Sequence, residues 1–196
     1  MVVSDSKKFA FVCIAKAAST SIRRRFGFMA TPENPDPPPH IYHMFLKDIV
    51  KEKPEAKDYF KFCFVRNPYD RLYSTYADFK YSLGHYWAKE AKEAKSFKDF
   101  VMNLPGSSYS EWIHLQPQVD YITIDGNIAV DYMGRVENMV EDFREVERKL
   151  GMPHVPLLRE RFSPKVDADP KIYDDDMKNV VRQHYKKDFE TLGYEE

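Results

Sequence analysis

Two strand-like apolar segments, each followed by a turn or polar residues and then by a helical pattern, constrain the fold of this chain most. The first is Phe9–Ile14 and the second is Phe60–Val65, which Lys61 interrupts. A continuous apolar run such as Phe9–Ile14 is typical of a strand that is covered on both faces in a parallel sheet. Because a helical pattern follows each run, the sequence predicts an α/β fold with a mainly parallel sheet flanked by helices.

The rest of the chain continues this alternation of strands and helices. Residue patterns predict a helix that begins over 22–26 and further helices over 45–50, 69–81, 136–150 and 177–192. Residues 86–102 are rich in Ala, Lys and Glu and are also predicted to be a helix. Two further strands, Val119–Ile124 and Ile128–Met133, are predicted around a turn at Asp125-Gly126. Residues 31–40 contain five prolines and are predicted to be a loop. With no internal repeat and no linker composition, residues 1–196 are expected to form a single domain.

Charge and apolar content exclude several classes of protein. The formal net charge of −1 argues against dedicated nucleic-acid binding, and 43% hydrophobic residues suffice for a globular core. No stretch approaches the roughly 20 apolar residues of a membrane span. The N-terminus lacks the apolar core and cleavage site of a signal peptide. We therefore expect a soluble, cytoplasmic protein.

The cysteines and the other possible metal ligands indicate neither a disulfide framework nor a metal centre. Cys13 and Cys63 both lie inside the apolar runs, so we expect buried, reduced thiols. No cluster of His, Cys, Asp or Glu has the spacing of a metal site, and no metal is expected.

The residues after the first apolar run can bind an anion. Lys16 supplies a cation, and the Ser19-Thr20-Ser21 cluster supplies hydroxyl donors at the start of a predicted helix. A turn that opens a helix also points free backbone N–H groups at an anion, and the helix dipole favours negative charge there. The segment has alanines where a Walker A loop has glycines, so it is not a Walker A motif. The alternative interpretation is a lysine beside ordinary capping hydroxyls.

The second apolar run leads to an arginine and a serine that suit a phosphate. Arg66 directly follows the predicted strand, where a charge is costly unless it has a partner. Ser74 lies eight residues later, about two helical turns, and so returns near the same helix face. Alternatively, Arg66 pairs with Asp70 and Ser74 is an ordinary helix serine. Together the two segments predict a site for an anion with two separated phosphate groups.

The same two segments carry a resemblance to a known family. The strings Ala-Lys-Ala-Ala-Ser-Thr-Ser at 15–21 and Phe-Val-Arg-Asn-Pro-Tyr-Asp-Arg-Leu-Tyr-Ser at 64–74 resemble the two nucleotide-binding motifs of the sulfotransferases, and more narrowly of the carbohydrate-type sulfotransferase 2 family. Further similarity at 134–143 and 185–194 extends the resemblance over nearly the whole chain. The first loop departs from the commoner family pattern, which has proline before the lysine and usually threonine and glycine after it. In this chain those positions are Ala15, Ala17 and Ala18.

The resemblance implies a P-loop-like nucleotide-binding fold that uses 3′-phosphoadenosine 5′-phosphosulfate (PAPS) and releases 3′-phosphoadenosine 5′-phosphate (PAP). The residues that it assigns to the 5′-phosphosulfate are Lys16, Ala17, Ala18, Ser19, Thr20 and Ser21. It assigns Arg66 and Ser74 to the 3′-phosphate. Lys165 lies in a late stretch where family members close the nucleotide site, and is expected to contact the 3′-phosphate or the adenine.

Sulfuryl transfer, like phosphoryl transfer, depends mostly on positioning and on stabilising charge. Lys16 suits the leaving phosphate oxygen, and a neutral acceptor hydroxyl needs a base, for which histidine is the natural side chain. His43 is the leading candidate, because similar family members carry a histidine between the two motifs. His40 lies three residues earlier. His114, in a His-x-x-Pro-Gln stretch that recurs in the family, is the second candidate base, and both His40 and His114 are expected near the acceptor.

The resemblance and the site residues together predict a PAPS-dependent sulfotransferase that acts on a hydroxyl, expected to be on a carbohydrate. One alternative is a P-loop-type kinase that uses ATP, which the missing Walker A motif and the lack of a clear Mg²⁺-binding carboxylate disfavour. The other alternative is an inactive module that binds a nucleotide or a glycan. An intact Lys16 and a suitable His43 argue against that last interpretation.

Overall fold

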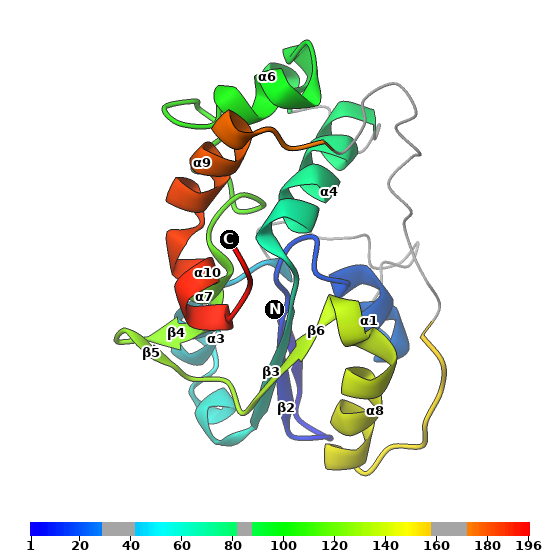
Figure 1. Ribbon diagram of the computed structural model, residues 1–196. Coiled ribbons are helices and arrows are strands. Elements are labelled where there is room, and N and C mark those ends of the chain that lie inside the picture. The colour runs from blue at the N-terminus through cyan, green and yellow to red at the C-terminus, as the bar shows by residue number, and fades with distance from the viewer. Residues whose placement is uncertain (29–41, 82–87, 158–171) are drawn as a thin grey trace. The chain divides into compact units, whose positions relative to one another are not determined.

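The computed structural model describes residues 1–28, 42–81, 88–157 and 172–196 (Figure 1). Its contacts divide the chain into two compact units. The first combines Met1–Arg66 with Gln118–Glu160, and the second combines Asn67–Pro117 with Arg161–Glu196. Each unit is described by itself below, and a single domain over 1–196 stays a prediction.

The first unit contains a four-stranded sheet that is mainly parallel. Its strands are β1 (Val2–Ser4), β2 (Phe9–Val12), β3 (Phe60–Val65) and β6 (Tyr132–Arg135), in the order β1-β2-β3-β6. β1 pairs antiparallel with β2, whereas β2–β3 and β3–β6 are parallel pairs. The prediction of a mixed α/β fold with a mainly parallel sheet is therefore confirmed, and the sequence located β3 to the residue.

Helices cover both faces of this sheet, which explains the wholly apolar sequence of β2 (Figure 1). One face packs against α1 (Ser19–Arg25) and α8 (Met139–Lys149), which contribute Ile22, Phe143 and Val146 to the core. On the other side lie α3 (Leu46–Glu52) and α7 (Gln118–Ile122), where the Phe45 and Tyr121 rings meet at 4.9 Å between centroids. The 3₁₀ helices η1 (Pro54–Asp58) and η2 (Val136–Asn138) complete the regular structure of this region.

Gly134 of β6 is required by the close packing of β3 beneath it. A Cβ atom at this position would lie 2.6 Å from Cε1 of the Phe64 ring. Real Cβ atoms essentially never approach this closely, so any larger residue here must displace the Phe64 ring.

The predicted strand over Val119–Ile124 is wrong for most of its length. Residues Gln118–Ile122 form helix α7, and only Thr123–Ile124 form a strand, β4. A short apolar run fits a buried helical turn as well as a strand, and here the tertiary packing of Tyr121 and Ile122 selects the helix. The predicted second strand is likewise split into β5 (Asn127–Ile128) and β6.

The predicted turn at Asp125-Gly126 is confirmed. It connects β4 to β5 as a two-residue hairpin, and both of its residues have positive φ, 51° at Asp125 and 79° at Gly126. This is the pattern of the tight hairpin turn that Asp-Gly favours.

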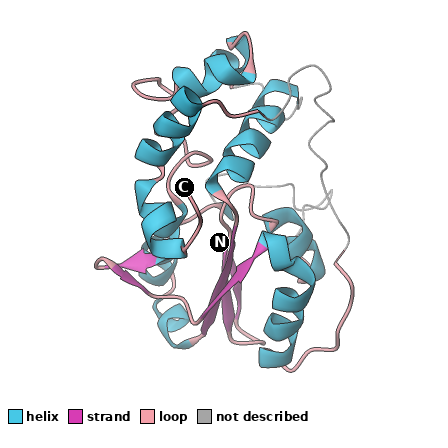
Figure 2. Cartoon of the chain, viewed as in Figure 1, coloured by secondary structure: helices cyan, strands magenta, loops and turns pink. Residues whose placement is uncertain are grey.

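The second unit, in its described residues, is built from helices and loops (Figure 2). Its helices are α4 (Pro68–Tyr81), α5 (Lys89–Glu93), α6 (Phe97–Met102), α9 (Asp175–His184) and α10 (Lys186–Leu192). The single helix predicted over 86–102 is therefore wrong in its described part. Ser96 starts a new helix there, because its hydroxyl accepts a hydrogen bond from the Asp99 N–H. The C-terminal helix is also divided, at Tyr185.

Two further findings concern the described residues only. None of their helices is both long and apolar enough to cross a membrane. They also contain no group of three or more His, Cys, Asp or Glu side chains that could hold a metal ion.

Candidate functional site

The loop between β2 and α1 turns through two residues in the left-handed conformation. Lys16 has φ 63° and Ala18 has φ 60°, and the Ala17 N–H donates to the Ile14 carbonyl oxygen at 3.3 Å. This conformation costs a non-glycine residue about 1–2 kcal/mol, and such strain is concentrated at functional sites. Left-handed residues in a turn also let successive backbone N–H groups converge into a concave anion site.

The first turn of α1 is suited to negative charge. Ala18 occupies the N-cap position, where its methyl side chain offers no capping oxygen, and the first turn contains no acidic residue. Ser19 is buried, whereas Thr20 and Ser21 are half-buried. The positive end of the helix dipole is therefore accompanied by hydroxyl donors and by no carboxylate of its own turn.

Arg66 lies immediately after β3, and its guanidinium reaches the loop that follows β2. Its Nη1 donates to the Lys16 carbonyl oxygen at 3.4 Å. The structure thus brings together the two cationic residues that the sequence placed in separate motifs. Both follow the carboxyl ends of adjacent parallel strands, which is where ligands bind in open α/β sheets.

Gln118, the last residue of the His-x-x-Pro-Gln stretch, holds the backbone of Arg66. Its Oε1 accepts from the Arg66 N–H at 2.9 Å, and its Nε2 donates to the Arg66 carbonyl oxygen at 2.8 Å. The side chain is fully buried as the first residue of α7. The His-x-x-Pro-Gln stretch pointed to this residue, but its contact with the Arg66 backbone could not be read from the sequence.

His43 hydrogen-bonds the backbone at the start of the same loop. Its Nδ1 lies 2.7 Å from the carbonyl oxygen of Cys13. A carbonyl oxygen can only accept, so Nδ1 carries the hydrogen, and in the neutral ring Nε2 is then the basic nitrogen. This is the tautomer that a general base acting through Nε2 requires.

The two cysteines are buried and reduced, as predicted, and they are not nucleophiles. Burial raises the pKa of the Cys13 thiol to about 12. Burial also raises the pKa of the Cys63 thiol well above its usual range. Both side chains therefore stay neutral near pH 7, and Cys13 contributes to the site through its carbonyl oxygen.

The remaining predicted site residues lie in the second unit or outside the described residues. Ser74 is buried on α4. His114 is only 4% exposed, and its ring packs edge-on against Phe79 at 5.3 Å between centroids. The acceptor role predicted for His114 would require this ring to become accessible, and it stays a prediction. His40 and Lys165 lie outside the described residues.

The second unit also contains a buried arginine of the 64–74 motif for which no role was predicted. Arg71 of α4 is fully buried, and its Nη2 donates to the His114 carbonyl oxygen at 3.1 Å. Its guanidinium lies 5.7 Å from the centre of the Tyr185 ring. Arg71 therefore connects α4 to two other segments of this unit and has a structural role there.

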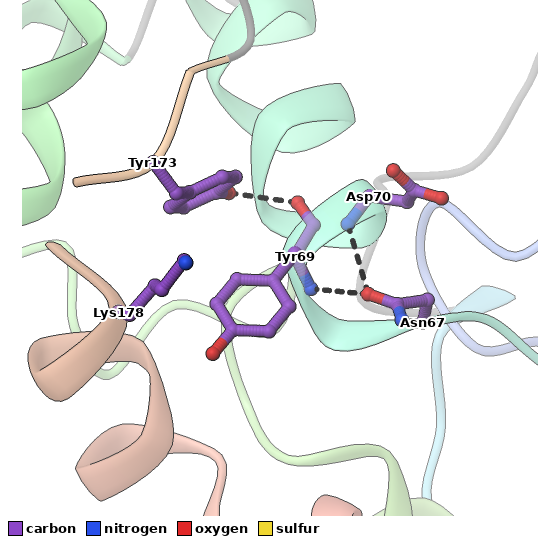
Figure 3. Close-up of a pocket in the computed structure, with 5 residues that line it drawn as sticks. All are labelled: Asn67, Tyr69, Asp70, Tyr173 and Lys178. Atoms are coloured by element: carbon purple, nitrogen blue, oxygen red, sulfur yellow. Dashed lines mark hydrogen bonds between the residues drawn. The ribbon is translucent and has the colours of Figure 1, made fainter. Parts of the chain in front are cut away.

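A cavity of about 280 Å³ lies at the first turn of α4 in the second unit (Figure 3). It is lined by Asn67, Tyr69, Asp70, Tyr173 and Lys178. Asn67 Oδ1 accepts from the Tyr69 N–H at 2.9 Å, and the Tyr173 hydroxyl donates to the Tyr69 carbonyl oxygen at 2.8 Å. The Asn67 side chain therefore occupies a backbone N–H at this helix end, which is then not available to a ligand in the cavity. Burial also raises the pKa of the Tyr173 hydroxyl.

Comparison with known proteins agrees with the two motifs. The model of the family described as "Sulfotransferase family" matches residues 1–195. An uncharacterized protein from Archaeoglobus fulgidus is 31% identical over 98 residues, which cover 48% of this chain and 70% of that protein. No solved structure matches the chain.

Proposed function

The chain belongs to the sulfotransferase family, and on that premise we propose that it transfers a sulfuryl group from PAPS to a hydroxyl of a carbohydrate. One observation carries the proposal. Lys16 and Arg66 follow neighbouring parallel strands and are in contact, with Arg66 Nη1 at 3.4 Å from the Lys16 carbonyl oxygen. Two cations on separate loops at one sheet edge suit a nucleotide that carries phosphate at both ends.

The donor site would be a P-loop-like turn that uses alanines in place of glycines. The strained backbone at Lys16 and Ala18, and the first-turn hydroxyls of α1, would hold the 5′-phosphosulfate. The guanidinium fork of Arg66 would hold the 3′-phosphate, with Ser74 and Lys165 as the further contacts that the family resemblance assigns. No step of this binding needs a metal ligand from the protein.

The proposed reaction uses His43 and Lys16. The acceptor oxygen bonds to sulfur while the bond between sulfur and the 5′-phosphate oxygen breaks, which releases PAP. The hydroxyl proton passes to Nε2 of His43, the basic nitrogen when Nδ1 donates to Cys13. The Lys16 ammonium stabilises the charge that develops on the leaving phosphate oxygen.

Calorimetry with PAP tests the donor site directly. We expect wild-type protein to bind PAP, and Arg66→Ala to weaken binding by about 10- to 100-fold, because charge-assisted hydrogen bonds to a phosphate are lost. Arg148→Ala is the matched control, because Arg148 is an exposed arginine that pairs with Glu145 on α8. Equal PAP affinity in folded wild-type and Arg66→Ala protein would contradict the site assignment.

A transfer assay tests the reaction and the acceptor. Radiolabelled PAPS is supplied with a panel of glycans, tyrosine-containing peptides and simple phenols, and label on a glycan supports the full proposal. Label on a peptide or phenol alone would keep the sulfotransferase activity and overturn the carbohydrate acceptor. PAP binding without transfer to any acceptor would favour an inactive nucleotide-binding module.

A further inference from the structure

Gln118 stands out because one buried side chain satisfies both backbone polar groups of Arg66. The donor–acceptor distances are 2.9 Å at the Arg66 N–H and 2.8 Å at its carbonyl oxygen. Only a group that accepts and donates at adjacent atoms can do this, and the glutamine amide is such a group. Gln118 is fully buried, so water has little access to its amide.

These two hydrogen bonds, called the Gln118 clamp below, lie just beyond the paired part of β3. The parallel pairing of β3 with β6 ends at Val65 and Arg135, one residue before Arg66. At Arg66 the Gln118 amide takes the place of a neighbouring strand and extends the hydrogen bonding of β3 by one residue. Buried backbone groups that lose such partners cost free energy, so the clamp holds the Arg66 backbone in a single conformation.

The fixed backbone of Arg66 also limits where its side chain can lie. Its guanidinium spans to the loop after β2, where Nη1 donates to the Lys16 carbonyl oxygen. A planar guanidinium recognises a phosphate only in a narrow geometry, so its origin must be positioned to well within an ångström. The Gln118 clamp holds the backbone atoms from which the Arg66 side chain extends.

We infer that Gln118 is a positioning residue that sets the preference of this site for a 3′-phosphorylated nucleotide, acting through Arg66. The inference rests on the proposed function, in which Arg66 holds the 3′-phosphate. Both polar atoms of the Gln118 amide bond the backbone of Arg66. Loss of Gln118 should therefore weaken recognition of the 3′-phosphate selectively and leave the rest of the nucleotide site intact.

The test is the ratio of affinities for PAP and for 5′-AMP, which lacks the 3′-phosphate. Gln118→Met keeps the length of the side chain and removes both hydrogen bonds. We expect it to weaken PAP binding about tenfold, while 5′-AMP binding changes less than about twofold. Gln116→Met is the matched control two residues earlier, because Gln116 is half-buried and donates to the Ser110 carbonyl oxygen.

A purely structural role would lower both affinities together, and that result would overturn the inference. An unchanged affinity ratio in folded Gln118→Met protein would overturn it as well. Should Gln118→Met fail to fold, Gln118→Asn keeps the amide but is one methylene too short to make both bonds. It should lower the ratio in the same direction.

Two additional measurements separate this inference from the proposed function. In an Arg66→Ala background, Gln118→Met should no longer change the affinity ratio, because the residue through which it acts is gone. A further change in that background would contradict action through Arg66. Wild-type protein that binds PAP no better than 5′-AMP would overturn the proposed function, and the inference with it.

Discussion

His43 donates its Nδ1 hydrogen to the carbonyl oxygen of Cys13 at 2.7 Å, and this bond determines which nitrogen of the ring is basic. Cys13 follows β2 and begins the loop that carries Lys16. The same loop backbone therefore orients the candidate base and presents the candidate donor-binding lysine. Under the proposed function, a shift of this loop would therefore move the base and the donor-binding lysine together.

The first prediction concerns His43 as the base. His43→Ala should lower kcat for sulfuryl transfer by about 10²- to 10⁴-fold, the usual contribution of general-base catalysis. The calorimetric affinity for PAP should stay within about threefold of wild type, because the role proposed for His43 is proton transfer and its Nδ1 bonds the loop backbone. A retained turnover rate would remove His43 from the reaction, whereas a large loss of PAP affinity would assign it to donor binding.

Much of the first unit could be predicted, because its two central strands are mostly apolar and buried. The bounds of β3 follow from the apolar-rich segment Phe60–Val65, and the Asp125-Gly126 turn follows from residue types that tolerate positive φ. Helix α7 could not be predicted in this way, because five residues do not distinguish a helical turn from a strand. Its helical state depends on packing against distant residues.

The candidate site was predictable in its charges and not in its supporting contacts. Lys16 and Arg66 stand out because cations after apolar strands need partners. Gln118 belongs to the His-x-x-Pro-Gln stretch, but its role could not be predicted, because it depends on contact with a residue 52 positions away in the sequence. The left-handed conformation of Ala18 could not be predicted either, since alanine disfavours that conformation.

The second prediction concerns this strained alanine. Ala18→Gly should raise the free energy of unfolding by about 0.5–1 kcal/mol, because relief of the left-handed strain exceeds the added entropy of the unfolded chain. Ala17→Gly is the matched control, since Ala17 is buried and does not have a positive φ. It should lower stability by a similar amount. Urea unfolding measures both, and a loss of stability in Ala18→Gly would contradict the strain.

The third prediction concerns the contact between β6 and β3. Gly134→Ala should lower stability by about 1–3 kcal/mol, because the new Cβ would lie 2.6 Å from the Phe64 ring. Combining it with Phe64→Leu, which removes the ring, should cost less than the sum of the two single changes. Thermal unfolding of the four proteins tests this coupling, and strict additivity would argue against a direct clash.

The fourth prediction compares two arginine–glutamate pairs that share helix α8. Glu147 is 1% exposed, and its carboxylate accepts from Arg25 Nε at 3.1 Å and from His154 Nδ1 at 2.7 Å. Arg25 also donates to the Pro153 carbonyl oxygen at 2.9 Å, so one buried carboxylate joins α1 to the segment after α8.

Removing one partner of a buried ion pair leaves the other charge without compensation, which typically costs about 3–5 kcal/mol. Arg25→Ala should fall at the lower end of that range, because His154 remains beside Glu147. Arg148→Ala breaks the exposed pair with Glu145 and should leave stability nearly unchanged, because solvent screens that pair. Urea unfolding of both variants makes the comparison, and equal losses would show that the burial of Glu147 does not determine the strength of its pairing.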